Sequence, residues 1–175
     1  VTGVQTCALP ILYDTLMAAG AEHGLVNAGY RAIESCRLEK GYRAWGSDIG
    51  PDHTPVEAGL GWAVKTASGI PFKGMGAVID QKSEGVRKML AAFTVDPSVV
   101  LLGRETIYRD GERVGWLTSG GFGYTIDRSI GYGYVRNPQG VTRNWVLSGT
   151  YELEVAGQRT PAEVSMQPQI GRAHV

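Results

Sequence analysis

The sequence has no excess of charge of either sign. Its 175 residues include 17 Lys and Arg and 17 Asp and Glu, so the formal net charge is zero. A domain that binds nucleic acid or an anionic membrane surface usually carries a clear positive excess. The charge balance therefore argues against both kinds of partner.

Cysteine and long apolar runs are also scarce. The two cysteines, Cys7 and Cys36, are not spaced like a metal-binding pair and are too few for a disulfide scaffold, which favours a reducing compartment. No apolar run approaches the roughly 20 residues that a membrane-spanning helix requires. We therefore expect no membrane partner.

Conventional catalytic signatures are missing as well. There is no Walker loop, no His-Glu-x-x-His and no CxxC pair. Gly120, Gly121 and Gly123 form a glycine cluster, but it lies between two predicted strands, whereas a nucleotide-binding loop opens a helix. A β-bulge or tight turn is the favoured interpretation of this cluster.

One short segment contains four residues of types that can ligate a divalent ion: Asp48, Asp52, His53 and Glu57. Hard oxygen ligands and one imidazole suit several metals. Their spacing does not match a known metal motif, however. A solvated acidic loop is the favoured interpretation, and no metal ligand is assigned.

Glycine is abundant by contrast. Twenty-five glycines and eight tyrosines, with few long apolar runs, indicate many short strands and tight turns rather than a helix bundle. Helical periodicity over residues 12–25 predicts one helix, with Gly24 as its C-terminal capping residue. A shorter segment, residues 28–36, could place Ile33 and Cys36 against a core. The predicted fold class is α+β.

The second half alternates strand-like pieces with hairpin signals. Residues 86–95 and the aromatic stretch 129–135 predict strands, and Asp110-Gly111 and Ala156-Gly157-Gln158 mark two hairpin turns. At least six short strands with regular turns predict a small antiparallel barrel or sandwich. We place the domain junction near Gly85.

The densest chemistry lies in residues 37–65. Cations surround one carboxylate, and large aromatics follow: Arg37, Glu39, Lys40, Tyr42, Arg43, Trp45 and Trp62. Near-regular glycines predict extended chain here, with a strand at 61–66. Arg37 and Glu39 would then share one strand face. From the residues alone, the favoured role of Glu39 is an ordinary ion pair with Arg37 or Arg43.

Several separated stretches resemble the aminomethyltransferase (glycine-cleavage T-protein) family in order and spacing. They are LYDTLMAAGAEHGL, RLEKGYRAWGSDIGPDHTPVEAGLGWAVK, RKMLAAFTV, SGGFGYTIDRSIGYGYV and RTPAEVSMQP. The resemblance is closest to the tetrahydrofolate-binding C-terminal half of sarcosine and dimethylglycine dehydrogenases. It implies that residues 12–84 are the C-terminal part of a folate-binding domain and residues 85–169 the C-terminal β-barrel domain.

The resemblance also implies a function and a cofactor set. In such proteins an upstream FAD domain oxidises an N-methyl amine, such as sarcosine or dimethylglycine, and tetrahydrofolate captures the one-carbon unit. The family's catalytic aspartate and the FAD domain would lie upstream of residue 12, so no catalytic residue is assigned and the fragment alone is expected to be inactive. The expected compartment is the bacterial cytoplasm, or the mitochondrial matrix in a eukaryote.

Three cofactor-binding residues follow from the matched motifs. Glu39 stands where the family's RLExG glutamate grips the pterin, since a carboxylate can accept two parallel hydrogen bonds from pterin N–H groups. Trp45 matches an aromatic residue that lines the folate site and could stack on it. Arg87 is the best match to an arginine associated with the cofactor, where it would meet the carboxylate tail.

Two alternatives to the dehydrogenase remain open. A stand-alone glycine-cleavage aminomethyltransferase would differ mainly in what precedes residue 12. A non-catalytic folate-domain relative would act as a binding or assembly factor. Relatives of that second kind carry a Lys-Gly-Cys-Tyr-like sequence, which is missing here. The dehydrogenase is therefore the favoured interpretation.

Both ends of the chain resemble translated sequencing-adapter DNA. These are residues 1–11, VTGVQTCALPI, and residues 170–175, IGRAHV. We expect both to be adapter-derived rather than native, which would make residues 12–169 an internal piece of a longer protein. An ordinary chain terminus is the alternative. Cys7 and His174 are accordingly given no functional role.

Overall fold

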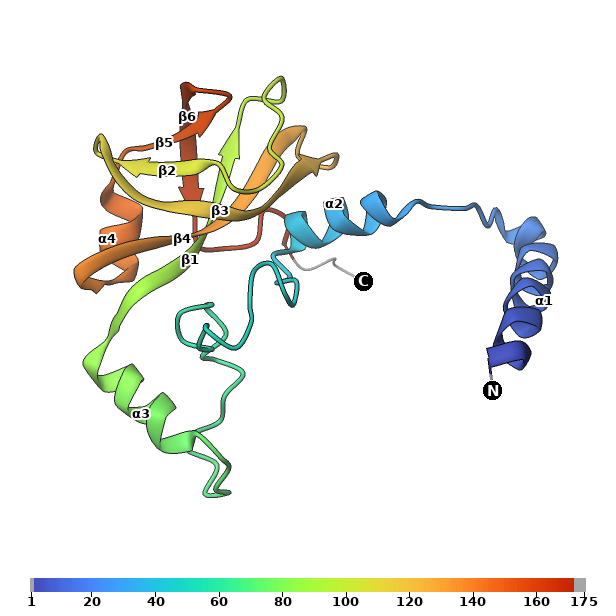
Figure 1. The fold of residues 1–175 in the computed structure, drawn as a ribbon, viewed down its shortest axis with the longest axis horizontal. Helices are drawn as coiled ribbons and strands as arrows, with labels where there is room; N and C mark the ends of the chain where they lie inside the picture. Colours follow the sequence, from blue (N-terminus) through green and yellow to red (C-terminus); the bar gives the residue numbers. More distant parts are fainter. Residues whose placement is uncertain (1, 172–175) are drawn as a thin grey trace. The chain divides into compact units, whose positions relative to one another are not determined.

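The computed structural model describes residues 2–171 of the chain (Figure 1). It divides into two compact units, one up to Ala32 and one from Ile33 onward. Of the ends expected to be adapter-derived, residues 1 and 172–175 lie outside the described residues. The origin of both ends stays a prediction.

The first unit is helical. Helix α1 covers Thr2–Gly20 and is followed by a 3₁₀ turn, η1, over Ala21–His23. The predicted helix is confirmed, although it begins before residue 12. Gly24 has a left-handed φ of 71° and donates its N–H to the carbonyl oxygen of Ala21, as expected for a residue that ends a helix.

Helix α2 covers Tyr30–Lys40, where extended chain was predicted at its C-terminal end. The extended prediction was wrong because the spaced glycines begin only at Gly41, which ends the helix instead of interrupting it. Gly41 has a φ of 72°, and its N–H and that of Tyr42 donate to the carbonyl oxygens of Leu38 and Arg37. This is a Schellman motif, which satisfies the last carbonyls of the helix.

The face of α2 that meets the rest of the second unit also differs from expectation. Leu38 and Glu39 are buried, whereas Ile33 is 62% exposed and Cys36 is exposed. Leu38 packs in a small cluster with Tyr132 and Tyr134 of the barrel. The last turn of the helix therefore makes the apolar contact, while Ser35 in its middle donates its hydroxyl to the carbonyl oxygen of Phe122 in β3 at 2.7 Å.

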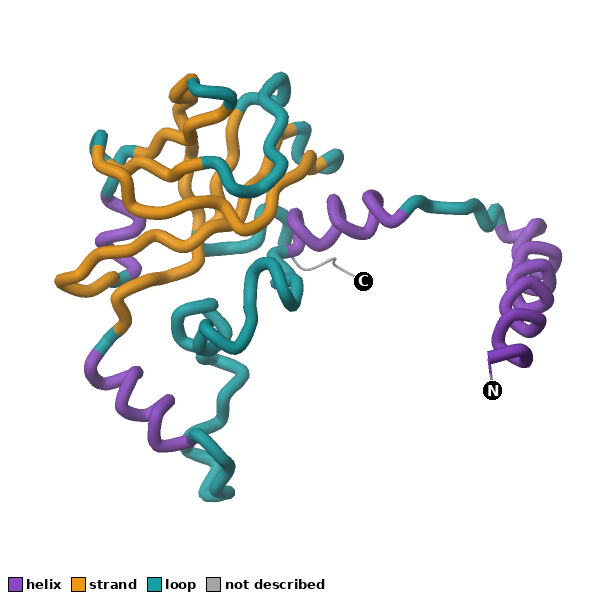
Figure 2. Tube along the Cα trace, in the orientation of Figure 1, coloured by secondary structure: helices purple, strands orange, loops and turns teal. Residues whose placement is uncertain are grey.

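Turns occupy most of the chain between α2 and helix α3, which covers Met75–Glu84 (Figure 2). The strand predicted at residues 61–66 was wrong, because this segment forms turns. An isolated bridge joins Trp45 and Ile49.

Six antiparallel strands close into a barrel, in the order β1-β4-β3-β2-β5-β6. Their bounds are β1 Val86–Val95, β2 Thr106–Arg109, β3 Glu112–Gly123, β4 Arg128–Val141, β5 Tyr151–Val155 and β6 Gln158–Ser165, with helix α4 at Arg143–Ser148. The predicted α+β class with a small antiparallel barrel is confirmed. Closure also leaves no sheet edge open to another chain.

Local turn chemistry explains two of the barrel's hairpins. Asp110 and Gly111 have φ values of 52° and 85°, and Ala156 and Gly157 have 49° and 78°. Positive φ at both central residues is what a two-residue type I′ hairpin needs. Both predicted hairpin turns are confirmed.

The glycine cluster has a different role from the predicted bulge or tight turn. Gly120, Gly121 and Gly123 lie within strand β3, and the register shift in that strand falls between Leu117 and Ser119. A Cβ on Gly120 would lie 2.9 Å from the backbone nitrogen of Gly103. The glycine therefore permits a close approach of backbone segments.

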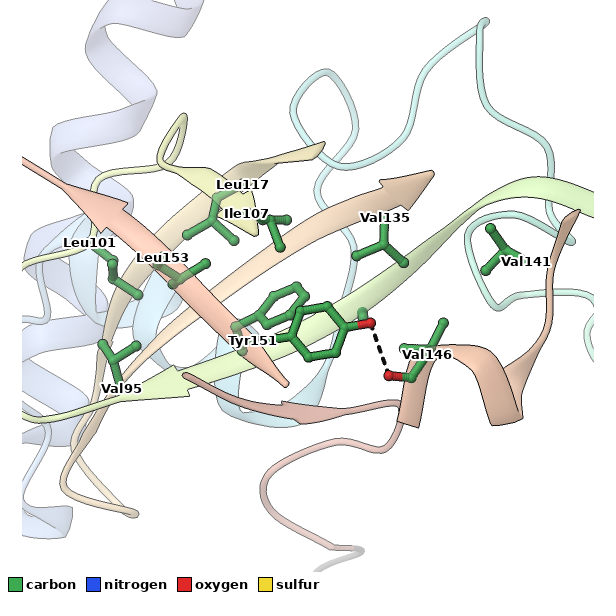
Figure 3. Close-up of a cluster of buried hydrophobic side chains, with 11 residues drawn as sticks. Val95, Leu101, Ile107, Leu117, Val135, Val141, Val146, Tyr151 and Leu153 are labelled. Atoms are coloured by element: carbon green, nitrogen blue, oxygen red, sulfur yellow. Dashed lines mark hydrogen bonds between the residues drawn. The ribbon is translucent and has the colours of Figure 1, made fainter. Parts of the chain in front are cut away.

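The main core fills the barrel interior (Figure 3). Phe93 and Tyr151 are almost fully buried, and their ring centroids lie 5.2 Å apart. The Tyr151 hydroxyl donates to the carbonyl oxygen of Val146 at 2.9 Å, which ties α4 to the barrel. Burial of this kind supplies most of the stability of a small β domain.

Candidate functional site

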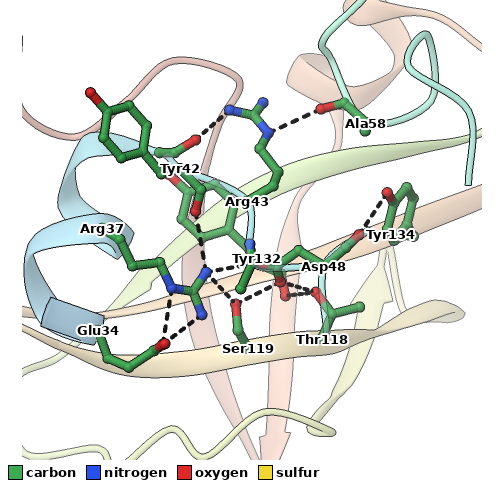
Figure 4. Close-up of polar contacts among 12 residues, drawn as sticks. Glu34, Arg37, Tyr42, Arg43, Asp48, Ala58, Thr118, Ser119, Tyr132 and Tyr134 are labelled. Atoms are coloured by element: carbon green, nitrogen blue, oxygen red, sulfur yellow. Dashed lines mark hydrogen bonds and ion pairs between the residues drawn. The ribbon is translucent and has the colours of Figure 1, made fainter. Parts of the chain in front are cut away.

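A buried carboxylate, Asp48, lies at the centre of the polar contacts between the turn segment and the barrel (Figure 4). Its residue is 0% exposed, so the predicted solvated loop was wrong for this position. Four groups donate to its two oxygens: Arg37 Nη1 at 2.5 Å, Thr118 Oγ1 at 2.6 Å, Ser119 Oγ at 2.8 Å and the Ala44 N–H at 3.0 Å. Buried charges are tolerated when they are paired and hydrogen-bonded in this way.

Arg37 joins that carboxylate to a second one. Its Nε and Nη2 both donate to Glu34 Oε2, at 2.9 and 2.7 Å. Arg37 therefore pairs with Asp48 and Glu34, not with Glu39 as the residue pattern favoured. The pairing partner was misjudged because Arg37 and Glu39 lie on a helix, where positions two apart point in different directions.

Glu39 is held by the barrel. It is 4% exposed, and Oε1 accepts from the backbone N–H groups of Thr125 and Ile126 at 2.6 and 3.3 Å, while Oε2 accepts from Thr125 Oγ1 at 2.8 Å. All three donors are neutral groups in the turn between β3 and β4. The carboxylate is thus fixed in orientation without an ion pair.

The geometry limits what else Glu39 can bind. A carboxylate offers about four acceptor positions, and the two N–H groups and one hydroxyl occupy three of them. One position remains, on Oε2. Binding of a further donor by both oxygens would require the β3–β4 turn to release Oε1, and Glu39 is not among the residues that line the groove described below.

The structure separates Glu39 from Arg87. Thr125, which holds Glu39, lies beside the end of β1 where Val95 pairs with Ser129. Arg87 is exposed near the opposite end of the same strand. Eight residues of strand span about 26 Å. Glu39 of α2 therefore lies beside one end of β1, and Arg87 lies near the other end of that strand.

Trp45 is open to solvent. It is 75% exposed and lies in the turn segment, where it forms a bridge with Ile49. Its ring is accessible for stacking. Its assignment as a folate-stacking residue stays a prediction, as do the assignments of Glu39 and Arg87.

A groove with a volume of about 850 Å³ runs from the end of α2 across the turn segment to the barrel. Its lining includes Lys40, Tyr42, Arg43, Trp62, Arg143 and Met166. The volume lies in the range of small-molecule sites. The first four belong to the segment 37–65, in which the sequence places the densest chemistry. Arg143 and Met166 were missed, because both lie far from that segment in the chain.

Among residues 8–171, whose side chains the structure describes, no three His, Cys, Asp or Glu side chains are grouped so that they could hold a metal ion. No helix of the described chain is both long and apolar enough to cross a bilayer.

Comparison with protein families finds a matching domain for each half of the sequence. Residues 4–68 match the GCVT N-terminal domain, and residues 88–170 match the Glycine cleavage T-protein C-terminal barrel domain. The chain belongs to the glycine cleavage T-protein family. The resemblance inferred from the sequence motifs is confirmed.

Relatives of this chain have names that describe different activities. The chain is 45% identical to mitochondrial sarcosine dehydrogenase of Mus musculus over 165 residues, which are 93% of this chain and 18% of that protein. It is 37% identical to the mitochondrial pyruvate dehydrogenase phosphatase regulatory subunit of Mus musculus, with 90% of this chain and 19% of that protein covered. The chain thus spans about a fifth of these relatives.

A solved family structure has the same fold. The glycine cleavage system aminomethyltransferase T from Bartonella henselae superposes with a TM-score of 0.75 at 26% identity, covering 94% of this chain and 44% of that one. The helices and closed barrel described above are therefore the family's architecture.

Three buried phenols of the barrel predict a dependence of stability on pH. Burial raises the pKa of Tyr132, Tyr134 and Tyr151 above the ordinary value of about 10. The unfolded chain then loses these protons before the folded chain does, so the free energy of unfolding falls as pH rises above about 10, by up to about 1.4 kcal/mol per pH unit per tyrosine. Urea titrations between pH 8 and 11 measure this loss.

Tyrosinate absorbance should show the same effect: as pH rises, it should increase at a higher pH in the folded protein than in the unfolded chain. The phenols of Tyr132, Tyr134 and Tyr151 should ionise at a higher pH in the folded protein than in the unfolded chain, because burial raises their pKa. Complete ionisation of all eight tyrosines while the fold is intact would contradict the expected burial.

Proposed function

We propose that this chain supplies part of a tetrahydrofolate site in a one-carbon-transfer enzyme. The observation that carries the proposal is the Glu39 carboxylate, which is 4% exposed and accepts three hydrogen bonds, all from neutral donors of the described chain. A desolvated, oriented carboxylate binds an N–H donor more strongly than a solvated one. In this proposal residues 12–84 are the C-terminal part of the folate-binding domain, and residues 85–169 are the barrel domain.

Each described group has a distinct part in this proposal. Tetrahydrofolate supplies the nucleophilic nitrogen that captures the one-carbon unit. Glu39 orients the pterin, and the β3–β4 turn holds Glu39 in place through Thr125. Trp45 offers an exposed ring for stacking, and Arg87 would need a second part of the ligand or protein to reach the same site.

The finer assignment is an FAD-dependent dehydrogenase that acts on sarcosine, dimethylglycine or a related N-methyl amine. It is supported by the sarcosine dehydrogenase relative. FAD would then lie in a domain encoded upstream of residue 12, and the compartment would be the mitochondrial matrix in a eukaryote or the cytoplasm in a bacterium. An upstream reading frame with a dinucleotide-binding GxGxxG segment supports this assignment. A start codon one folate domain upstream indicates a stand-alone aminomethyltransferase instead.

The substitution Glu39→Gln tests the folate proposal in protein that includes the sequence upstream of residue 12. Glutamine can still accept from the Thr125 N–H and can donate to the Thr125 hydroxyl, so the contact with the barrel persists. It cannot offer the charged acceptor, so tetrahydrofolate affinity should fall by roughly 10- to 150-fold, from about 1.5–3 kcal/mol for a hydrogen bond to a charged group. Isothermal titration calorimetry measures the affinity.

The control is Glu34→Gln, which alters another carboxylate of α2, one that pairs with Arg37. This variant should retain folate affinity. Unchanged folate binding by Glu39→Gln, with a thermal midpoint like that of the unaltered protein, would show that Glu39 has only a structural role.

A further inference from the structure

A small cavity adjoins the groove. It has a volume of about 20 Å³, enough for one oxygen-sized group. The cavity and the groove share lining residues: Gly41, Arg43, Leu90, Met166, Gln167 and Pro168. A ligand that occupies the groove can therefore extend one atom or small group into the cavity.

Tyr132 lines that cavity with an unused donor. The residue is 5% exposed, and within the described part of the chain its buried hydroxyl has no hydrogen-bond partner. The hydroxyls of Tyr134 and Tyr151 are bonded to the carbonyl oxygens of Asp48 and Val146, each at 2.9 Å. Since buried polar groups are almost always satisfied, the Tyr132 hydroxyl indicates an acceptor that binds there.

Arg43 lines the same cavity as a second donor. Its Nε donates to the Ala58 carbonyl oxygen at 3.0 Å and its Nη1 to the Gly41 carbonyl oxygen. These bonds fix the guanidinium plane. The Nη2 donors take no part in the hydrogen bonds of the described chain, so a fixed cation stands beside the phenol.

The positive charge of the groove lining favours an acceptor that is negatively charged. Lys40, Arg43 and Arg143 line the groove, and none of its described lining residues is acidic, although the chain as a whole is neutral. Tyr42 and Trp62 are 65% and 81% exposed and offer aromatic faces along the same surface. A groove with cations and flat aromatic rings suits an anion that carries an aromatic group.

We propose that this groove binds a carboxylate whose molecule also carries an aromatic group, with one carboxylate oxygen in the small cavity, where it accepts from the Tyr132 hydroxyl and from Arg43. Two sources have this chemistry. One is a free arene carboxylate, and the other is the aminobenzoyl-glutamate part of tetrahydrofolate, a reading that rests on the proposed function. On the second reading the carboxylate tail lies at Arg43 rather than at Arg87.

The test uses p-aminobenzoyl-glutamate as the probe and its dimethyl ester as the neutral comparison, with the full chain. The acid should bind and the ester should bind at least tenfold more weakly. The substitution Tyr132→Phe should lower affinity for the acid by about tenfold. It should leave the thermal midpoint equal or higher, because it removes a hydroxyl that has no partner.

The matched control is Tyr124→Phe, at a tyrosine that is 77% exposed, which should change neither value. A tetrahydropterin without the aminobenzoyl-glutamate tail separates this proposal from the folate proposal. Its affinity should respond to Glu39→Gln and not to Tyr132→Phe. A tetrahydropterin affinity that is unchanged in Glu39→Gln, with the acid still bound, would overturn only the role of Glu39.

The two sources give different results with the probes. Binding of the acid together with a tetrahydrofolate affinity that falls in Tyr132→Phe assigns the groove to the cofactor tail. Binding of the acid with unchanged tetrahydrofolate affinity assigns it to a free arene carboxylate. Failure of the acid to bind at millimolar concentration, or equal binding by the acid and its ester, would overturn the proposal.

Discussion

Replacing Asp48 by alanine should lower the free energy of unfolding by about 3–5 kcal/mol. The substitution leaves the Arg37 guanidinium, whose side chain is 11% exposed, without its partner at 2.5 Å. It also removes the acceptor of Thr118, Ser119 and the Ala44 N–H. A domain of this size is stable by only about 5–15 kcal/mol. The substitution should therefore remove a large part of the free energy of unfolding.

Urea denaturation measures the effect, with Asp52→Ala as the matched control. Asp52 lies in the same turn segment, and its residue is exposed. Its replacement should change the free energy of unfolding by less than about 0.5 kcal/mol. The Arg37 side chain keeps Glu34 as a second partner at 2.7 Å, which favours the lower end of the range for Asp48→Ala.

A double-mutant cycle separates the ion pair from the other bonds of Asp48. Arg37→Met combined with Asp48→Ala should cost less than the sum of the two single changes, because the second substitution no longer strands a buried charge. A cost for Asp48→Ala that equals that of Asp52→Ala would contradict the buried network.

Replacing Phe93 by alanine should cost about 3–5 kcal/mol through a different mechanism. Phe93 is 0% exposed in the C-terminal half of β1, and its ring packs against Tyr151 with centroids 5.2 Å apart. The smaller side chain leaves a cavity that a closed barrel cannot easily collapse, since hydrogen bonds on both sides of β1 hold the strand in register. Phe93→Leu should cost clearly less, because it restores part of the volume.

Phe72→Ala provides the matched control, because this phenylalanine is 41% exposed and lies in the loop before α3. It should cost about 1 kcal/mol or less. Chemical denaturation followed by tryptophan fluorescence compares the three variants. If Phe93→Ala and Phe72→Ala had equal midpoints, the barrel interior could not be the main core.

These two predictions differ in how far the sequence anticipated them. Strand β1 and its apolar run were predicted with the correct bounds, so Phe93 was expected in a strand. Asp48 was expected in a solvated loop, because the residues beside it are turn formers and polar. Nothing local shows that Ser119, 71 positions later in the chain, supplies a hydrogen-bond donor to Asp48.

The sequence by itself determined the family, the α+β class and the barrel hairpins. Their signals are local: motifs in a fixed order, and glycine or aspartate where a turn requires positive φ. Only the tertiary structure decided the partners of the charged residues in 37–65. Glu39 binds Thr125, 86 positions away, and the Tyr132 hydroxyl faces a cavity shared with Arg43. Such contacts depend on where the closed barrel meets α2, which residue type and spacing do not encode.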